Sequence, residues 1–221
     1  ASSAAGIARA ASVLCDSWSG TSVERRLPTL GVPVGPYLDA ARPEARRALE
    51  DQLEALARAG CRIRYLPALR DIEDVAARHL RLITKEFEQV HAEWFRQHGS
   101  VYRPQSAMLM MRARGLAEES IEVGRRSGEE LRSELEALMD AHELDAWASP
   151  AATGAAPQGL HSTGDAAMNL PWTHARLPAL SLPAGRSDDG LPLGLQLAGR
   201  RGADERLVAL AQQLEPLLAA G

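Results

Sequence analysis

The chain has 221 residues, of which 45% are hydrophobic and 24% are charged, and it carries a formal net charge of −4 at pH 7. These values are ordinary for a soluble globular protein with a substantial core, and they exclude the basic surface expected of a protein that binds nucleic acid or an anionic membrane. No apolar run approaches the roughly 20 residues that a transmembrane helix needs.

The few cysteines and the single lysine limit the kinds of site that this chain can form. Two cysteines, Cys15 and Cys61, do not make a disulfide framework, and no Cys/His spacing indicates a metal site, so we expect neither metal nor cofactor. Residues 1–20 lack the basic segment and the continuous apolar segment of a signal peptide, which makes the cytoplasm the default location. The 25 basic residues comprise 24 arginines and a single lysine, Lys85, so any lysine-based chemistry in this chain would have to use Lys85.

The start of the chain predicts a strand, helix, strand unit. In order, we expect a helix over residues 2–20 that stops at Gly20, a strand over Leu30–Val34, a helix over residues 43–59 and a strand over Cys61–Leu66. Pro43 suits the first turn of its helix, and Gly60 stands where a helix ends in a left-handed residue. Two strands joined by a helix over about 35 residues are typical of a right-handed βαβ unit.

A long helix is predicted over residues 71–98. Its apolar residues recur at spacings of three and four and form one face that we expect to point inward: Ile72, Val75, Ala76, His79, Leu80, Ile83, Phe87, Val90 and Trp94. Lys85 lies in this helix beside Glu86 and Glu88, so we expect a solvated surface lysine rather than a neutral base, which would require burial.

Two further helices are predicted, one opening at Pro104 and one over residues 117–142. The first carries three methionines, Met108, Met110 and Met111. We expect these to fill a core rather than to line an adaptable pocket. In the second, Gly124 and Gly128 let a neighbouring backbone approach closely, or merely weaken the helix.

The last part of the chain predicts three strands and a final helix. They are expected over Leu144–Ser149, Leu177–Pro183, Leu191–Ala198 and Ala203–Glu215, with a loop over residues 150–165 and a helix stop at Pro216. Neither of the last two strands alternates cleanly, so we expect both to be interior, with helices on each face. Pro178, Pro183 and Pro192 are expected at strand ends, because proline donates no hydrogen bond to a sheet. The pattern predicts an α/β fold with a mixed β-sheet flanked by helices.

The stretch from Asp165 to Arg200 reads DAAMNLPWTHARLPALSLPAGRSDDGLPLGLQLAGR. An Asn, a short polar stretch, LPALSLPAG, a variable loop and GLPLGLQLAG, followed by a helix, resemble the C-terminal part of the amidase signature family. These are serine hydrolases of carboxamides that include one of the glutamyl-tRNA amidotransferase subunits. Residues 6–20 are similar to the family helix that follows the nucleophile region. The resemblance implies the C-terminal part of the amidase signature fold, with residues 1–221 as the C-terminal portion of a single amidase-like domain whose N-terminal catalytic portion is absent.

The catalytic apparatus that the resemblance implies is a serine nucleophile, a second serine in a cis peptide and a lysine. The family carries the serines on a GGSSGGS-type loop with the lysine well upstream, and this chain contains neither. Ser2 and Ser3 imitate the loop but lack the flanking glycines that would let backbone N–H groups face an oxyanion. We therefore assign no catalytic residue.

A Ser/His/Asp triad is the alternative apparatus. It could be drawn on paper from His161, His174, Ser149, Ser162, Ser181 and Asp165. A triad is recognised by geometry, and no serine here lies in a GxSxG elbow. We favour hydrogen-bonded structural histidines.

A pocket wall is the contribution that we expect from the segment leading into the strand at Leu177. Residues 163–165 and 169–174 lie where α/β sheets place ligand sites, so we predict substrate binding by Asn169, Trp172, Thr173 and His174. The alternative is that these polar groups only stabilise the loop. Asn169 corresponds to the Asn of the family pattern.

The implied reaction of the complete family enzyme is amide-bond hydrolysis through an acyl-serine, without metal or cofactor. We expect the chain alone to be inactive and to act on a small-molecule amide only when completed by an N-terminal half. The alternative is a non-catalytic amidase-like scaffold or interaction protein. In either case we expect an exposed apolar surface that a second copy or a partner chain would cover.

Overall fold

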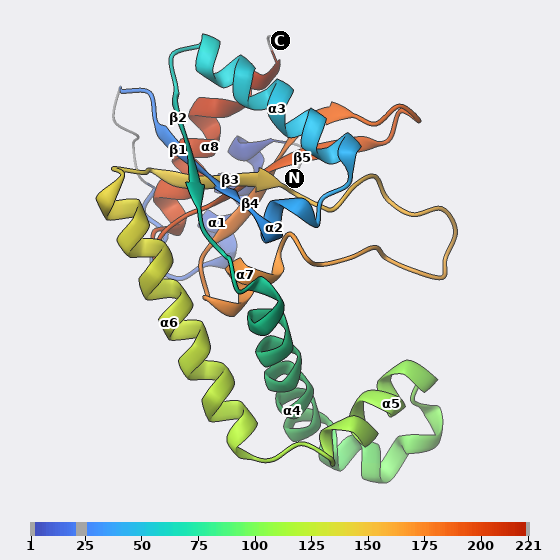
Figure 1. Ribbon diagram of the computed structural model, residues 1–221. Coiled ribbons are helices and arrows are strands. Elements are labelled where there is room, and N and C mark those ends of the chain that lie inside the picture. Colours follow the sequence, from blue (N-terminus) through green and yellow to red (C-terminus); the bar gives the residue numbers. More distant parts are fainter. Residues whose placement is uncertain (1–2, 21–25, 220–221) are drawn as a thin grey trace.

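The computed structural model describes residues 3–20 and 26–219 (Figure 1). Five strands form one mixed sheet in the order β2-β1-β3-β5-β4. Their bounds are Thr29–Val34 for β1, Arg62–Pro67 for β2, Ala146–Pro150 for β3, Ala179–Arg186 for β4 and Pro192–Ala198 for β5. β1 is parallel to β2 and β3, whereas β5 is antiparallel to β3 and β4. The predicted mixed sheet is confirmed.

Helices cover both faces of this sheet. They are α1 (Ala4–Leu14), α2 (Pro36–Asp39), α3 (Pro43–Arg58), α4 (Ile72–His98), α5 (Pro104–Ala113), α6 (Glu119–Ala141), α7 (Leu170–His174) and α8 (Asp204–Ala219), with a 3-10 turn η1 at Gly99–Val101. α1, α3 and α8 share a core with the sheet on one face. On the other face α2, α6, α7 and the start of α4 pack around Trp147 and Trp172. We call the sheet and these covering helices the body.

The strand, helix, strand unit forms as predicted. β1 and β2 pair in parallel with Thr29 opposite Arg62. Pro43 begins α3, and Gly60 follows its end with a φ of 103°, a backbone conformation that favours glycine. Local signals were sufficient here because the proline and the glycine act within a single helical turn.

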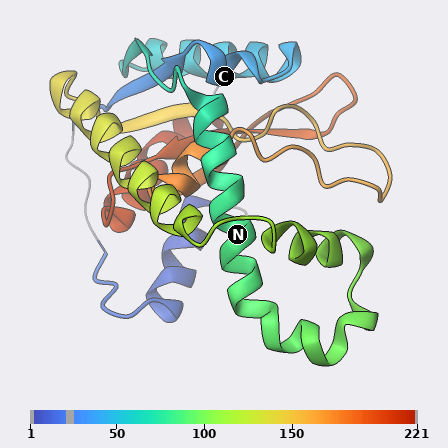
Figure 2. The same cartoon turned by 60° about the horizontal axis from the view of Figure 1, so that its bottom comes forward.

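The second half of α4, together with η1 and α5, projects away from the sheet (Figures 1 and 2). We call residues 80–113 the arm. The predicted inward face of α4 is wrong beyond its first turns: Val75 is buried, but Leu80, Val90 and Trp94 are 53%, 65% and 57% exposed. The spacing was correct for a helix, but this part of α4 extends past the sheet and packs on α5 and α6 instead, through other residues such as the buried Leu82.

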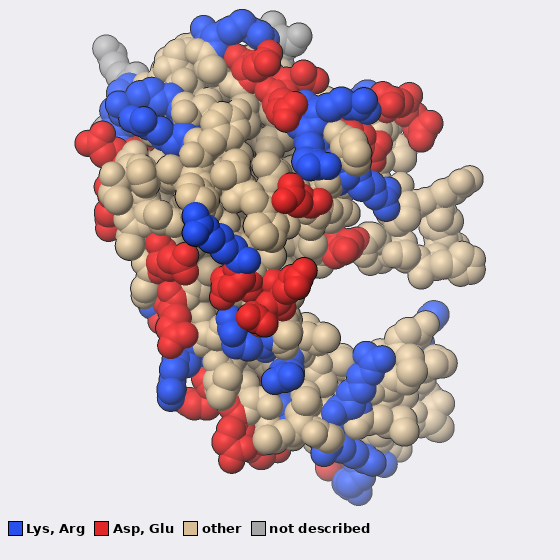
Figure 3. All heavy atoms as spheres, in the orientation of Figure 1, with Lys and Arg blue, Asp and Glu red and all other residues tan. Residues whose placement is uncertain are grey.

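The methionines of α5 also differ in their exposure to solvent. Met110 is buried, as expected of a core residue, whereas Met108 and Met111 are exposed. On the face shown in Figure 3, a hollow separates the arm from the loop that follows β3. Acidic and basic side chains are interspersed over that face.

The two glycines of α6 explain how closely the helices approach. A Cβ at Gly128 would lie 2.4 Å from the carbonyl oxygen of His174, and one at Gly124 would lie 2.6 Å from the Cβ of Leu82. The close backbone approach is thus confirmed at Gly128, against α7. At Gly124 the neighbour is a side chain of α4.

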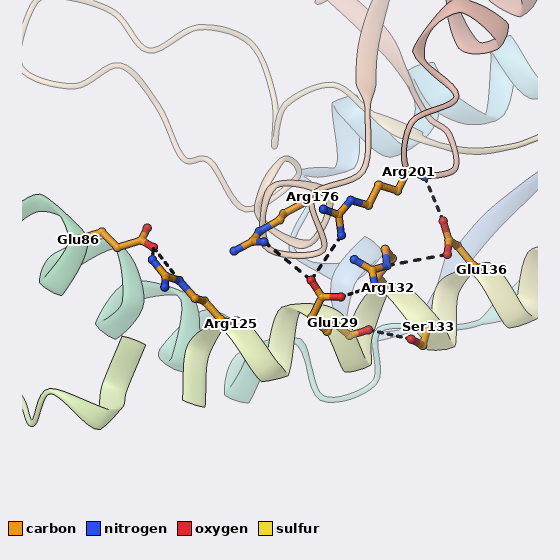
Figure 4. A network of polar contacts seen from close by, with 8 residues as sticks. All are labelled: Glu86, Arg125, Glu129, Arg132, Ser133, Glu136, Arg176 and Arg201. Atoms are coloured by element: carbon orange, nitrogen blue, oxygen red, sulfur yellow. Dashed lines mark hydrogen bonds and ion pairs between the residues drawn. The ribbon is translucent and has the colours of Figure 1, made fainter. Parts of the chain in front are cut away.

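Charged side chains along α6 connect it to its neighbours (Figure 4). Arg125 pairs with Glu86 of α4 at 3.0 Å. Glu129 lies 3.8 Å from Arg176, just after α7, and 3.5 Å from Arg201, after β5. α6 therefore holds the arm, α7 and the end of the sheet in one arrangement.

Three expectations about helix and strand limits were wrong. α1 ends at Leu14, with extended backbone at Cys15, so Gly20 does not stop it. Pro216 lies inside α8, which continues to Ala219, because Leu217 and Leu218 still pack on the core. β4 stands at the end of the strand order and exposes Ser181 and Pro183, so of these two strands only β5 is interior.

The prolines of the hairpin mostly lie where predicted. Pro178 precedes β4 and Pro192 begins β5, whereas Pro183 lies within β4. The register shifts between Pro183 and Arg186. A bulge on an outer strand tolerates proline because the missing N–H removes no regular ladder bond.

Candidate functional site

A pocket of about 320 Å³ opens at the carboxyl end of β3. Its lining comprises Ala45, Ala48, Pro150, Ala151, Ala152, Gly154, Ser181, Pro183, Pro192, Leu193 and Gly194. The carboxyl ends of parallel strands are where α/β sheets place ligands. Ser181 supplies the one polar side chain of this lining, so the pocket suits a small neutral ligand.

Asn169 stands beside this pocket, immediately before α7. Its side chain is exposed, and its Nδ2 donates to the carbonyl oxygen of Ala151, a lining residue, at 3.3 Å. Its Oδ1 accepts a hydrogen bond from Nε2 of Gln196 on β5. Of the four predicted binding residues, Asn169 is the one that directly contacts the pocket wall.

A buried polar network lies behind Asn169. The Oε1 of Gln196 accepts from Oγ of Ser149 at 3.3 Å, and Ser149 lies 3.1 Å from the hydroxyl of Tyr37. Tyr37 donates to the carbonyl oxygen of Met168 at 2.7 Å. Burial raises the pKa of Tyr37 well above its usual range, so the hydroxyl keeps its proton and remains a donor.

Gln196 and Tyr37 were not predicted to be parts of this site. Gln196 is the one polar side chain in the run Leu193–Ala198, and a lone amide in a buried strand is a signal that could have found it. Tyr37 gave no such signal, because its partners Ser149 and Trp172 are far away in the chain.

Trp172 is a core residue. It is 1% exposed, and its Nε1 donates to the hydroxyl of Tyr37 at 3.2 Å. The two rings meet edge to face, with centroids 5.8 Å apart. Trp172 therefore holds α7 against α2, and its contact with a substrate stays a prediction.

His174 is also buried, at 3% exposure. Its Nε2 lies 3.1 Å from Oγ of Ser127, and its Nδ1 lies 3.2 Å from Nδ1 of His79. Burial, helped by the charges of His79, Arg78 and Arg176, lowers the pKa of His174 to about 4. It is a neutral hydrogen-bonding residue that joins α7 to α4 and α6, whereas Thr173 is exposed on the surface.

Three of the residues considered for a triad, His174, Ser149 and Asp165, have other partners. His174 contacts Ser127 and His79, whereas Ser149 contacts Tyr37 and Gln196. Asp165 accepts a hydrogen bond from the backbone N–H of Ala167. These contacts give each group a structural partner.

Ser3, the one described member of the Ser2-Ser3 pair, has a structural role. Ser3 accepts a hydrogen bond from the N–H of Gly6 at 3.1 Å and so caps α1. Ser2 lies outside the described residues.

Lys85 is not the solvated surface lysine that we predicted. Its side chain is 4% exposed and lies between Glu88 at 2.7 Å and Glu118 at 2.6 Å. Hydrogen bonds to Glu118 and Glu88 raise the pKa of Lys85, so it remains a cation. The expectation failed because Glu118, which precedes α6, is 33 residues away in the chain.

Two further classes of site were sought in the described part of the chain. Over residues 3–20 and 26–219, no group of three or more His, Cys, Asp or Glu side chains could hold a metal ion. Within the same residues, no helix combines the length and apolar character required to cross a bilayer.

The chain is similar in sequence to a known protein family and to several known proteins. The family model described as Amidase matches residues 18–208. A glutamyl-tRNA(Gln) amidotransferase chain from Granulibacter bethesdensis is 43% identical over 79 residues, which cover 33% of this chain and 16% of that protein. Mandelamide hydrolase from Pseudomonas putida is 42% identical over 52 residues, or 23% of this chain and 10% of that protein.

Solved structures match over nearly the whole chain. A crystal structure of an amidase superposes with a TM-score of 0.85 and 25% identity, covering 98% of this chain and 51% of the other. The structure of 6-aminohexanoate cyclic dimer hydrolase has a TM-score of 0.72 at 20% identity, over 98% of this chain and 53% of the other, and shows a common fold. The chain therefore spans about half the length of these solved proteins.

Proposed function

The chain belongs to the amidase family, and from this premise we propose that it is the part of an amide hydrolase that forms the substrate pocket but does not carry the nucleophile. The observation that carries the proposal is the superposition on an amidase, which covers 98% of this chain and 51% of the other. The family's GGSSGGS-type loop has no counterpart in the 221 residues. The chain is thus the C-terminal portion of a single catalytic domain.

The chemistry is acyl transfer through a serine, as the family resemblance implies. A serine hydroxyl attacks an amide carbonyl only when a neighbouring base accepts its proton and N–H groups receive the oxyanion. Lys85 cannot be that base, because two carboxylates hold it as a cation. The base and both serines therefore belong to a segment other than residues 1–221, and this chain alone is inactive.

The substrate is a small neutral amide. Alanine, proline and glycine dominate the pocket lining, and Asn169 brings an amide group to its wall. Asn169 and Thr173 are exposed and contact the substrate, while Trp172 and His174 hold α7 in place. The free thiols Cys15 and Cys61 suit a reducing compartment, so we place the reaction in the cytoplasm.

The test compares two proteins. One is this chain alone, and the other is this chain joined to the N-terminal region of its own gene product. We expect ammonia release from small neutral amides only from the joined protein, with loss of turnover when the nucleophilic serine of that region is replaced by alanine. Turnover by the chain alone that disappears in Ser3→Ala would contradict the proposal and identify a nucleophile in α1's cap.

One observation favours a second candidate function, a non-catalytic scaffold. The arm exposes Leu80, Val90 and Trp94, and apolar stripes of this kind mark interaction surfaces. If the joined protein is folded but cleaves no amide, and copies associate through the arm, the scaffold is the better description.

A further inference from the structure

The amide group of Asn169 has a definite orientation. A primary amide offers two N–H hydrogens and an oxygen with two lone pairs. Gln196 Nε2 donates to Oδ1, and Nδ2 donates to the carbonyl of Ala151 at 3.3 Å. Within the described residues this leaves one Nδ2 hydrogen for a ligand. Because the side chain is exposed beside the pocket lining, a substrate oxygen can reach it.

Gln196 can hold that orientation because a second contact, with Ser149, orients its own amide. Gln196 is buried, and its Oε1 accepts from the hydroxyl of Ser149 at 3.3 Å. Rotating the amide by half a turn would place its nitrogen against Ser149 and its oxygen against Oδ1 of Asn169, so two oxygens would face each other. The neighbouring Tyr37 hydroxyl is committed to Met168 and cannot relieve that contact.

One end of the network lies beside the pocket, at Asn169, and the other lies in the core, at the carbonyl oxygen of Met168. Tyr37, Ser149 and Gln196 come from α2, β3 and β5 and are all buried, yet their hydrogen bonds lead to an exposed side chain. Stabilising the core does not require a hydrogen bond to an exposed amide. The same exposed amide also binds the carbonyl of Ala151 and so shapes the pocket wall.

We propose that Gln196 is a positioning residue: it orients Asn169 so that the site donates a hydrogen bond to an acceptor oxygen of a neutral amide substrate. This inference rests on the proposed function. Gln196 acts through Asn169 and does not itself touch the substrate. The ligand chemistry follows from the free Nδ2 hydrogen, which can pair with a carbonyl oxygen but not with an ammonium group.

Two substitutions separate orientation from packing. Gln196→Glu keeps the shape but replaces the donor with an acceptor, which repels Oδ1 of Asn169. Gln196→Met keeps most of the volume and removes both hydrogen bonds. Gln52→Glu is the matched control, because it makes the same chemical change at another buried glutamine, on α3.

The experiment measures kcat and KM for benzamide, together with the melting temperature, in the joined protein. Gln196→Glu and Gln196→Met should each lower kcat/KM about tenfold or more, while Gln52→Glu, with a comparable melting temperature, should retain wild-type kinetics. In a double-mutant cycle, Gln196→Met should cost almost nothing further once Asn169 is alanine.

Three results would overturn the inference. The first is wild-type kinetics in both Gln196 variants. The second is an equal loss from Gln196→Met with and without the Asn169 side chain, which would show a general structural effect. The third, an inactive wild-type protein, would overturn the proposed function itself and with it the positioning role that depends on it.

Discussion

The body and the arm contain helices of similar sequence character but bury them to different extents. In the body, Leu56 of α3 and Leu214 of α8 are completely enclosed against the sheet. In the arm, Val90 and Trp94 have the spacing of a buried face and are more than half exposed. Apolar periodicity therefore predicts that a helix forms, but whether its apolar face is covered depends on which layer lies opposite.

The largest expected effect comes from placing a charge in each region. Leu195→Asp or Leu197→Asp should lower the free energy of unfolding by about 4 kcal/mol or more, because a carboxylate would be buried without a partner. Val90→Asp, the matched change in the arm, should change it by less than about 0.5 kcal/mol. Urea unfolding measures both. Similar losses in the two regions would mean that the arm is covered as the body is.

The next effect concerns the contact between α6 and α7. Gly128→Ala should destabilise the protein by about 1–3 kcal/mol, because the new Cβ would lie 2.4 Å from the His174 carbonyl oxygen. Gly115→Ala is the control, since its nearest neighbour would be 3.5 Å away. Thermal unfolding of the two variants should differ clearly. An unaffected Gly128→Ala would show that α6 and α7 can separate freely.

A smaller effect is expected from pH at the junction between body and arm. The pKa of His174 is lowered to about 4, and burial also lowers the pKa of His79. Below the ordinary histidine pKa of 6.5, the unfolded chain therefore binds more protons than the folded chain. Stability is therefore full above pH 6.5 and falls as the pH drops towards 4.

Urea unfolding at a series of pH values measures this dependence. His174→Gln should flatten the profile, whereas replacement of the exposed His142 should leave it unchanged. A wild-type protein whose stability is constant from pH 7 to pH 4 would contradict the assignment of His79 and His174 as a neutral pair.

The smallest effect on stability should accompany a large effect on association. Trp94→Ser removes an exposed ring from the arm, so we expect almost no change in the free energy of unfolding. In sedimentation experiments, however, the wild-type chain should self-associate and the variant should do so less. Gln97→Ser, an exposed polar change on the same helix, is the control. A wild-type chain that remains monomeric at high concentration would show that the arm does not mediate self-association.

Most signals that act within a few residues were read correctly, although Gly20 does not stop α1. Pro43 and Gly60 bound α3, and the turn-forming residues after β4 produce the predicted hairpin. Pro216 was misread because the local cost of proline in a helix is offset by the packing of Leu217 and Leu218 on a distant core.

Distant packing also decides how the side chains of the candidate site are oriented. The pattern around Asn169 located the segment, but it could not distinguish the exposed Asn169 from the buried Trp172 and His174. All four residues lie within six positions of one another, and a short helix turns them in different directions. Which side faces the pocket is decided by the neighbours of α7.

The sequence by itself determined the long helices, the five strands, the hairpin and the family, because spacing, caps and turn residues act locally and the family pattern is contiguous. The short helices α2 and α7 were not predicted. Only the tertiary structure decided that Lys85 is buried, that α4 leaves the sheet, and that Tyr37, Ser149 and Gln196 converge on Asn169. The hydrogen bond between Trp172 and Tyr37 joins residues 135 positions apart. Contacts of that range depend on how layers stack, and no local pattern in the chain encodes them.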